Sequence, residues 1–247
     1  MRTAAMRLAA LAQRAAAVTD LYWIAHADDD GLWMDLQEAN ASVGRHAIHT
    51  VILTDMSTDG VYELLTGTGG VCPIHHVTHA YTMTRAQFTS YRDAEGQANA
   101  ADMGGTYHIP SDRMVSGALT SAYCKTQMRA YAALYPGATH HALSWVDSFH
   151  PDHRATGFAL RDLVDDSTIP IGRACFHLRT EDMAGNAGAE VIASVGAATL
   201  AETALAEYTI WNPGSNRYAI GYHGVQSLFD DQLSAAHNKT HTAAQNR

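Results

Sequence analysis

The sequence predicts an α/β fold with a mostly parallel sheet in a single domain, and three observations lead to this prediction. Residues 21–25 (LYWIA) and 47–54 (AIHTVILT) have the aromatic and β-branched composition of buried strands. Residues 31–43 between them have a helical pattern, so the three segments form the βαβ unit of a parallel sheet. The chain has 247 residues with no internal repeat or linker, which fits one large domain.

The other elements follow in chain order. Residues 1–20 are Ala-rich and are interrupted by Arg7 and Arg14, which favours a helix packed on the domain over a signal peptide. Asp30 is expected to cap the helix over 31–43, because Asp is a favoured N-cap. Residues 55–76 are loop-like because glycines interrupt them. We expect helices at 84–102, at 112–134, from about residue 153 and at 188–208, and strands at 106–109, 139–146 and 217–225.

Residues 21–228 are therefore expected to form the domain, and 229–247 a polar tail that is disordered from 237 onward. The net charge of −9 argues against nucleic acid as a partner. No stretch approaches the roughly 20 apolar residues of a membrane span. The three cysteines are widely spaced and contain no CxxC motif, so we expect reduced thiols in a cytoplasmic protein.

The stretch IAHADDDGLW, residues 24–33, holds the clearest chemical signal. An apolar strand ends at His26, and three aspartates follow almost at once. Adjacent carboxylates repel one another unless a cation lies among them. His150 and His153 follow the predicted strand over 139–146. Because ligands bind at the carboxyl ends of parallel strands, the two polar clusters are expected to meet at one edge of the sheet.

Together these residues predict a catalytic zinc site. His26, Asp29 and His153 are of the ligand types that hold zinc with one position open. Zinc lowers the pKa of bound water to about 7. Asp28 is the spare carboxylate that can take the proton of this water, and His150, as an imidazolium, can stabilise an oxyanion or protonate a leaving amine.

Two alternatives stay open on the residues alone. Asp28, Asp29 and Asp30 can instead hold Mg²⁺ for phosphoryl transfer, because magnesium prefers oxygen ligands. A carbohydrate-binding protein without catalytic activity is the other alternative, although the intact base and histidines count against it.

Two motifs resemble signatures of the PIG-L/LmbE-like zinc-dependent N-acetylglucosaminyl deacetylases. They are AHADDD at 25–30 and HPDHRATG at 150–157. TRAQFTSYRDAE at 84–95 is similar to a family region with an Arg-x-x-Glu helix, and NRYAIGYHGV at 216–225 is similar to the ending of some members. The resemblance covers about 21–228. It implies a Rossmann-like three-layer α/β fold and zinc-dependent hydrolysis of an N-acyl group on an N-acetylglucosamine-type amino-sugar conjugate, a small-molecule substrate.

Carried over position by position, the resemblance assigns each residue a role. The zinc ligands are His26, Asp29 and His153, the general base is Asp28, and His150 assists the oxyanion or the leaving group with Asp152 as its tuning partner. Arg92 matches a substrate-binding arginine. Ala27 and Asp30 replace a family proline and glutamate. An amidase acting on a thiol conjugate is the alternative within the same chemistry.

Three further features could line the substrate cleft. Trp145, beside the second motif, could stack on a sugar ring, and His223 could reach the cleft from the last predicted strand. The histidine-rich segment 74–79 (IHHVTH) has no acidic partner nearby, which favours a cleft-lining loop over a second metal cluster.

Overall fold

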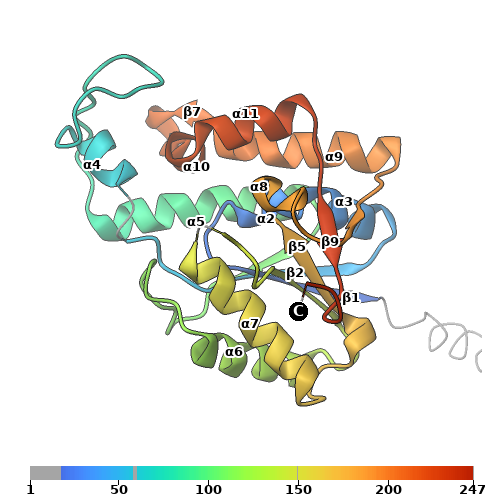
Figure 1. Cartoon of the computed structure of the whole chain (residues 1–247). Coiled ribbons are helices and arrows are strands. Elements are labelled where there is room, and N and C mark those ends of the chain that lie inside the picture. Colours follow the sequence, from blue (N-terminus) through green and yellow to red (C-terminus); the bar gives the residue numbers. More distant parts are fainter. Residues whose placement is uncertain (1–17, 58–59, 149, 247) are drawn as a thin grey trace, which may run out of the picture.

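The computed structural model describes residues 18–57, 60–148 and 150–246. A central sheet lies between two layers of helices (Figure 1). Most of the helix predicted over 1–20 falls outside the described residues, and β1 (Thr19–Ile24) begins at the end of that range. None of the helices in the described part of the chain is both long enough and apolar enough for a membrane span.

The central sheet has seven strands in the order β3-β2-β1-β4-β5-β9-β6. The first five strands of this order are mutually parallel, and β9 runs antiparallel to both β5 and β6. The predicted mostly parallel sheet is therefore confirmed. The remaining strands are β2 (Ala47–Ile52), β3 (Thr106–His108), β4 (Thr139–Leu143), β5 (Ala174–Leu178), β6 (Ala189–Glu190) and β9 (Lys239–His241), and a separate ribbon pairs β7 (Trp211–Asn212) with β8 (Arg217–Tyr218).

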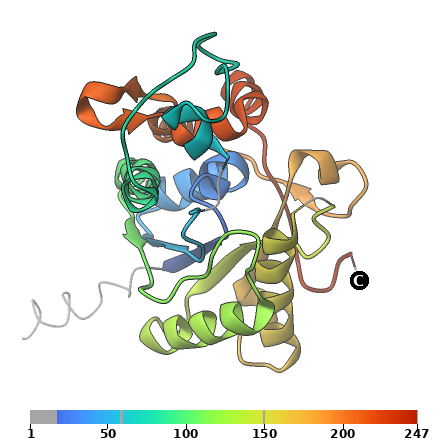
Figure 2. The same ribbon diagram turned by 90° about the vertical axis from the view of Figure 1, so that its left-hand side faces the viewer.

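Side chains of β1 alternate between the two cores, as the period of a strand requires. Leu21 and Trp23 pack on one face with α6 (Ser121–Leu134) and α7 (Pro151–Asp165). Tyr22 and Ile24 pack on the other face with the second layer of helices. This layer includes α2 (Asp29–Trp33), α3 (Asp35–Val43), α9 (Val195–Ala206) and α11 (Gln226–Ser234). Figures 1 and 2 show the two layers from directions 90° apart.

The long helix α5 (Arg85–Asp102) follows Thr84, which forms a capping box at its N-terminus. The remaining helices are short: α4 (Val61–Thr66), α8 (Thr180–Met183), α10 (Ile220–Gly224) and the 3₁₀ turns η1 (Ile171–Arg173), η2 (Glu207–Thr209) and η3 (Pro213–Ser215).

Several predicted elements are wrong in their type or extent. The helix over 31–43 is two helices that meet at Met34, and Asp30 lies inside the first of them rather than capping it. Residues 61–66 are helical within the predicted loop. Helix α6 starts only at Ser121, where Thr120 caps it, and α9 starts at Val195. Residues 220–224 form α10 instead of a strand.

The prediction of a disordered C-terminal tail is also wrong. The strand β9 lies within that segment and fills the place between β5 and β6 in the central sheet. The tail is polar, but strand pairing uses backbone groups, which every non-proline residue carries. Buried polar contacts hold it as well, because Asn238 accepts a hydrogen bond from the backbone N–H of Leu36 (2.9 Å).

Candidate metal centre and active site

The two predicted motifs come together because β1 and β4 are adjacent parallel strands. His26 lies just beyond the end of β1, and Asp29 opens α2. His150 is the N-cap of α7, and His153 lies in the first turn of that helix. The carboxyl ends of the two strands therefore place both motifs at one edge of the sheet, as expected for this topology.

Three donor atoms form a small triangle at this edge. His26 Nδ1 lies 3.0 Å from His153 Nε2 and 3.6 Å from Asp29 Oδ1, and His153 Nε2 lies 3.1 Å from Asp29 Oδ1. A tetrahedral zinc ion with bonds of about 2.0–2.2 Å separates such ligand atoms by about 3.3–3.5 Å. All three side chains are buried. The donor types and their spacing therefore fit a zinc ion.

Hydrogen bonds to neighbouring groups orient Asp29 and His153 of the triangle. Asp29 Oδ2 accepts hydrogen bonds from the backbone N–H groups of Ala25 (2.9 Å) and His26 (2.8 Å), which leaves Oδ1 facing the two histidines. His153 Nδ1 lies 2.9 Å from Asp147 Oδ2. Donation from Nδ1 to this carboxylate leaves the Nε2 lone pair free for a metal, which is the usual outer arrangement of a metal-binding histidine.

Asp152 contacts both His26 and His150, through different groups. Its carboxylate accepts hydrogen bonds from the backbone N–H groups of Gly117 (2.7 Å) and Leu119 (3.1 Å) and lies 3.3 Å from His26 Nε2. His150 Nδ1 accepts a hydrogen bond from the backbone N–H of Asp152 (3.3 Å). The side chain of Asp152 therefore contacts His26, while its backbone N–H binds His150 and its charge opposes the fall in the pKa of His150. Its role as the tuning partner of His150 stays a prediction.

The triangle is built to hold positive charge. Burial lowers the pKa of His26, but the Asp29 charge and the hydrogen bond with Asp152 outweigh this effect and raise the pKa to about 10. Burial opposes ionisation of Asp29, yet the positive charges of His153 and His26 hold its pKa well below the ordinary value. The charges around these three groups therefore favour a cation among them.

His150 responds to that same positive charge. Burial, followed by repulsion from His26 and His153, lowers the pKa of His150 to about 4. The side chain is therefore a neutral imidazole near pH 7, where the sequence suggested an imidazolium. Because Nδ1 accepts a hydrogen bond, the proton of the neutral ring is assigned to Nε2, which makes His150 a hydrogen-bond donor.

A cavity of about 260 Å³ opens onto the triangle. Asp28, His150 and Arg92 join the triangle in lining it, and Trp33, Met56, Val225 and Leu228 add an apolar part of the wall. Arg92 is buried, and its Nη2 lies 2.8 Å from Asp28 Oδ2. Its Nη1 lies 3.3 Å from Glu95, which accepts hydrogen bonds from the backbone N–H groups of Ile220 and Gly221.

Two predicted substrate-binding residues are not at this cavity. Trp145 packs against Phe176 and His241, with ring centroids 4.7 and 4.8 Å away, and donates its indole N–H to the carbonyl of Asn246 (3.2 Å). Its position in the core makes the prediction that it stacks on a sugar wrong. His223 lies in a separate cluster, although the next residues, Gly224 and Val225, do line the cavity.

Two residues of the site were missed from the sequence. Asp147 holds both histidines of the second motif, because its Oδ1 also accepts the backbone N–H of His150 (2.6 Å). The sequence offered one signal for it, because Asp147 is an acidic residue directly after the predicted strand over 139–146. Arg179 lines the cavity and directly follows β5. Its position at the sheet edge follows from β5, which was not predicted.

No protein-family model matches this sequence, and no curated protein matches it. Solved structures do match. A40926 pseudoaglycone deacetylase Dbv21 aligns with a TM-score of 0.62 at 14% identity, over 92% of this chain and 96% of its own. The N,N'-diacetylchitobiose deacetylase from Pyrococcus horikoshii aligns with a TM-score of 0.60 at 16% identity, over 92% and 84%.

The chain has the fold of these deacetylases. This confirms the α/β architecture expected from the resemblance to LmbE-like proteins. The 4-carboxy-2-hydroxymuconate hydratase GalB from Pseudomonas putida KT2440 also aligns, with a TM-score of 0.57 at 13% identity, over 91% of this chain and 95% of its own. One fold therefore carries two reactions, and the reaction has to be argued from the site.

Proposed function

We propose that this chain is a zinc-dependent hydrolase that removes the N-acetyl or another N-acyl group from an N-acetylglucosamine-type amino-sugar conjugate. The observation that carries the proposal is the triangle of His26, Asp29 and His153 at the base of a cavity, with Asp28 and His150 in the same wall. The fold shared with a pseudoaglycone deacetylase and a diacetylchitobiose deacetylase supports it.

Zinc held at the triangle would lower the pKa of a bound water to about 7 and polarise the amide carbonyl. Asp28 is the group that accepts the proton of the attacking water, because its carboxylate faces the cavity and belongs to neither the triangle nor a backbone cap. Arg92 fixes the direction of that carboxylate through its 2.8 Å contact. Returning the proton to the departing nitrogen yields the free amine and acetate.

His150 stabilises the charge that develops on the carbonyl oxygen. The neutral ring presents an N–H at Nε2, because Nδ1 is engaged by the backbone of the first turn of α7. A preorganised donor of this kind contributes most in a buried site where water competes poorly. The role proposed for His150 therefore needs no charged imidazolium.

The Mg²⁺ alternative fits the geometry poorly. Asp28 pairs with Arg92. Asp30 accepts hydrogen bonds from Gly31 N–H (2.8 Å) and the Tyr208 hydroxyl (2.8 Å), and it does not line the cavity. The three aspartates therefore do not converge on one point, whereas a magnesium site would need several of their oxygens around one ion.

A metal-dependent hydratase acting on an unsaturated carboxylate is the second candidate. Two arginines, Arg92 and Arg179, line the cavity, and arginine is the residue best suited to bind carboxylates. Both arginines already contact acidic side chains of the chain, Arg92 with Asp28 and Arg179 with Glu181 (3.0 Å). We therefore rank hydration below amide hydrolysis.

The deciding experiment measures amine and acetate release from a panel of N-acetylglucosamine conjugates. The panel includes diacetylchitobiose, a glycopeptide pseudoaglycone, an inositol glycoside and a thiol conjugate whose second amide reports amidase action. We expect release in equal amounts from at least one member, loss of release with a chelator, and recovery with stoichiometric zinc. Chelator-insensitive release would contradict the proposed metal, and hydration of an unsaturated dicarboxylate with no amide cleavage would select the second candidate.

Asp28→Asn tests the proposed base. The substitution keeps the shape of the side chain but removes its ability to accept a proton, so we expect a rate loss of about 10²–10⁴-fold with zinc content unchanged. Asp102→Asn, on the exposed end of α5, is the matched control and should leave the rate unaltered. Wild-type turnover by Asp28→Asn would remove Asp28 from the mechanism.

A further inference from the structure

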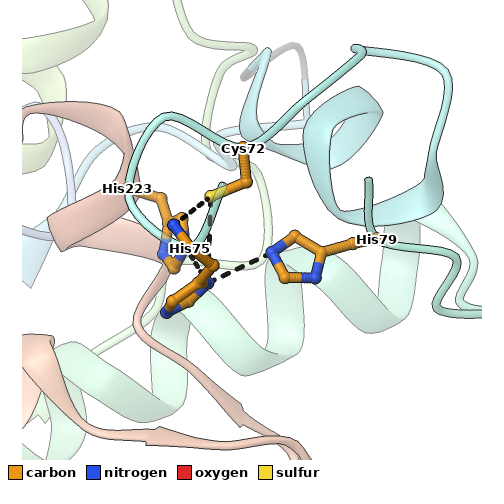
Figure 3. Close-up of side chains that lie close together, drawn as sticks. All are labelled: Cys72, His75, His79 and His223. Carbon is orange, nitrogen blue, oxygen red and sulfur yellow. Dashed lines mark hydrogen bonds between the residues drawn. The ribbon is translucent and has the colours of Figure 1, made fainter. Parts of the chain in front are cut away.

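A second cluster of metal-binding side chains lies apart from the triangle. It contains Cys72, His75 and His79 from the loop over 67–84, and His223 from α10 (Figure 3). The sequence predicted that the histidines of this loop line the cleft, because no acidic partner lies near them. Folding instead brings them a thiol from the same loop and an imidazole from 148 residues further along the chain.

The distances within this cluster match those of a tetrahedral zinc site. His75 Nδ1 lies 3.1 Å from His79 Nε2, 3.4 Å from His223 Nε2 and 3.8 Å from Cys72 Sγ. Zinc bonds of about 2.0–2.1 Å to nitrogen and 2.3 Å to sulfur require about 3.3 Å between nitrogens and about 3.6 Å between nitrogen and sulfur. All four ligand atoms lie within 4.8 Å of one another.

Hydrogen bonds alone explain this convergence poorly. His223 Nδ1 donates to the carbonyl of Ala219 (2.7 Å), so its Nε2 points a lone pair at His75. The single proton that His75 Nδ1 can carry can bridge to only one of its three neighbours. A cation at the centre satisfies all of them together, and the backbone bond of His223 is the usual support of a metal-binding imidazole.

Three of the four side chains are buried, as is typical of a structural site. Cys72 is 0% exposed, His79 7% and His223 8%, while His75 is half-buried. Trp211 covers it, with its ring centroid 4.1 Å from His75, 5.0 Å from His79 and 5.1 Å from His223. Four protein ligands fill a tetrahedral ion and leave no open position for a substrate.

We propose that Cys72, His75, His79 and His223 bind a structural zinc ion that fastens the loop over 67–84 to α10. Figure 3 shows the loop residues and His223 approaching from two separate segments. This link between the loop and α10 also supports the cavity wall, because Gly224 and Val225, which line the cavity, follow His223 directly. At the other end of α10, Glu95 holds the N–H groups of Ile220 and Gly221 and contacts Arg92, which in turn contacts Asp28.

Cobalt substitution tests the site independently of any activity. A thiolate bound to Co²⁺ gives a charge-transfer band in the near ultraviolet, and the triangle at the cavity has no sulfur ligand. We expect this band in the cobalt-loaded full chain and its loss in Cys72→Ser. The matched controls Cys124→Ser and Cys175→Ser should keep the band. No band in the wild-type chain would overturn the proposal.

Cys175 matters as a control because it lies with His141 and His177 in another group. There His141 Nδ1 pairs with His177 Nε2 (3.1 Å), His141 Nε2 faces Asp20 (3.3 Å) and His177 Nδ1 faces the Trp33 carbonyl (3.2 Å), so each ring nitrogen has a partner. Loss of the band in Cys175→Ser with retention in Cys72→Ser would move the thiolate site there and overturn the proposal.

Zinc content gives a second measurement, which does not depend on whether Cys72→Ser folds. With zinc also at the triangle, we expect two zinc ions in the wild-type chain and one in His153→Ala, with the cobalt band intact in the latter. A chelator should lower the melting temperature of His153→Ala and expose the loop over 67–84 to protease. Loss of all zinc in His153→Ala, with no response to the chelator, would also overturn the proposal, whatever becomes of the hydrolase activity.

Discussion

Asp147 shows how one residue can position two others. Its Oδ1 accepts the backbone N–H of His150 (2.6 Å), and its Oδ2 faces His153 Nδ1 (2.9 Å). Arg179 Nε lies 3.6 Å from that second oxygen. A single buried carboxylate therefore fixes the start of α7 and the ring direction of a metal ligand. The zinc affinity of the triangle should depend on this residue, although it contacts no metal itself.

Asp147→Asn should weaken zinc binding at the triangle by about 10–100-fold, which is the usual cost of losing an outer carboxylate. Competition with a chromogenic chelator measures this affinity. The thiolate band of the Cys72 cluster should be unchanged, which separates a local effect from misfolding. Asp166→Asn, at the exposed end of the same helix, is the matched control. Equal zinc affinity in Asp147→Asn and Asp166→Asn would contradict the role given to Asp147.

Among the elements, α7 carries the second motif and depends on one glycine. A Cβ atom at Gly157 would lie 2.3 Å from the backbone nitrogen of Trp145 and 2.6 Å from the carbonyl oxygen of Leu143. Both atoms are backbone, so neither can rotate away. The helix therefore packs directly on the end of β4, and this close approach places His150 and His153 beside the end of β1.

Gly157→Ala should destabilise the protein by about 1–3 kcal/mol or more, because the overlap forces α7 away from β4. Denaturant unfolding measures the change, and zinc affinity at the triangle should fall with it. The control is Gly196→Ala within α9, where a Cβ meets nothing within 4 Å. That substitution should stabilise the helix by about 0.5–1 kcal/mol. A Gly157→Ala protein as stable as wild type would show that α7 tolerates a shift.

The elements that were predictable from sequence are those with strong local patterns. The strands β1 and β2 contain aromatic and β-branched runs, and β4 is followed by the second polar motif. The adjacency of β1 and β4 then brings His26, Asp29 and His153 together. Tertiary contacts set the rest. Residues 220–224 have a strand-like composition, but Glu95 from a distant helix binds the N–H groups of Ile220 and Gly221 and starts α10 there.

The errors at the site have similar causes. Trp145 follows a strand that ends at Leu143, three residues earlier than predicted, and its ring packs in the core. His223 could be assigned to the Cys72 cluster only after α10 was placed against the loop over 67–84. A sequence pattern carries the spacing within one segment, but it carries no information on which distant segment completes the ligand set.

At the scale of the whole molecule, the C-terminal segment closes the fold around buried polar groups. Asp35 in the first turn of α3 is buried, and its Oδ1 accepts hydrogen bonds from Leu36 N–H (2.8 Å) and from Gln232 of α11 (2.9 Å). Burial raises the pKa of Asp35 to about 6, although these hydrogen bonds oppose the rise. The Asp35 side chain therefore links α3 to α11, and burial favours its protonated form.

The raised pKa of Asp35 predicts that the stability of the whole molecule falls as the pH rises. The pKa of Asp35 is 3.8 before folding effects and about 6 in the folded chain. A raised folded pKa means that the contribution to stability is complete below about pH 4 and is lost as the pH rises through 6. A shift of about two units corresponds to about 3 kcal/mol. Wild-type stability from this source should therefore fall by that order between pH 4 and 7.

Asp35→Asn removes the titration while keeping a hydrogen-bond acceptor at the same place. We expect the variant to match wild type near pH 4 and to exceed it by up to about 3 kcal/mol at pH 8. Denaturant unfolding at several pH values gives the difference between the two proteins, and contributions from the metal ligands cancel because both share them. Gln232→Met removes a hydrogen bond that lowers the pKa of Asp35, so its loss of stability should extend to higher pH. Parallel pH profiles for wild type and Asp35→Asn would show that Asp35 is ionised at no cost in stability.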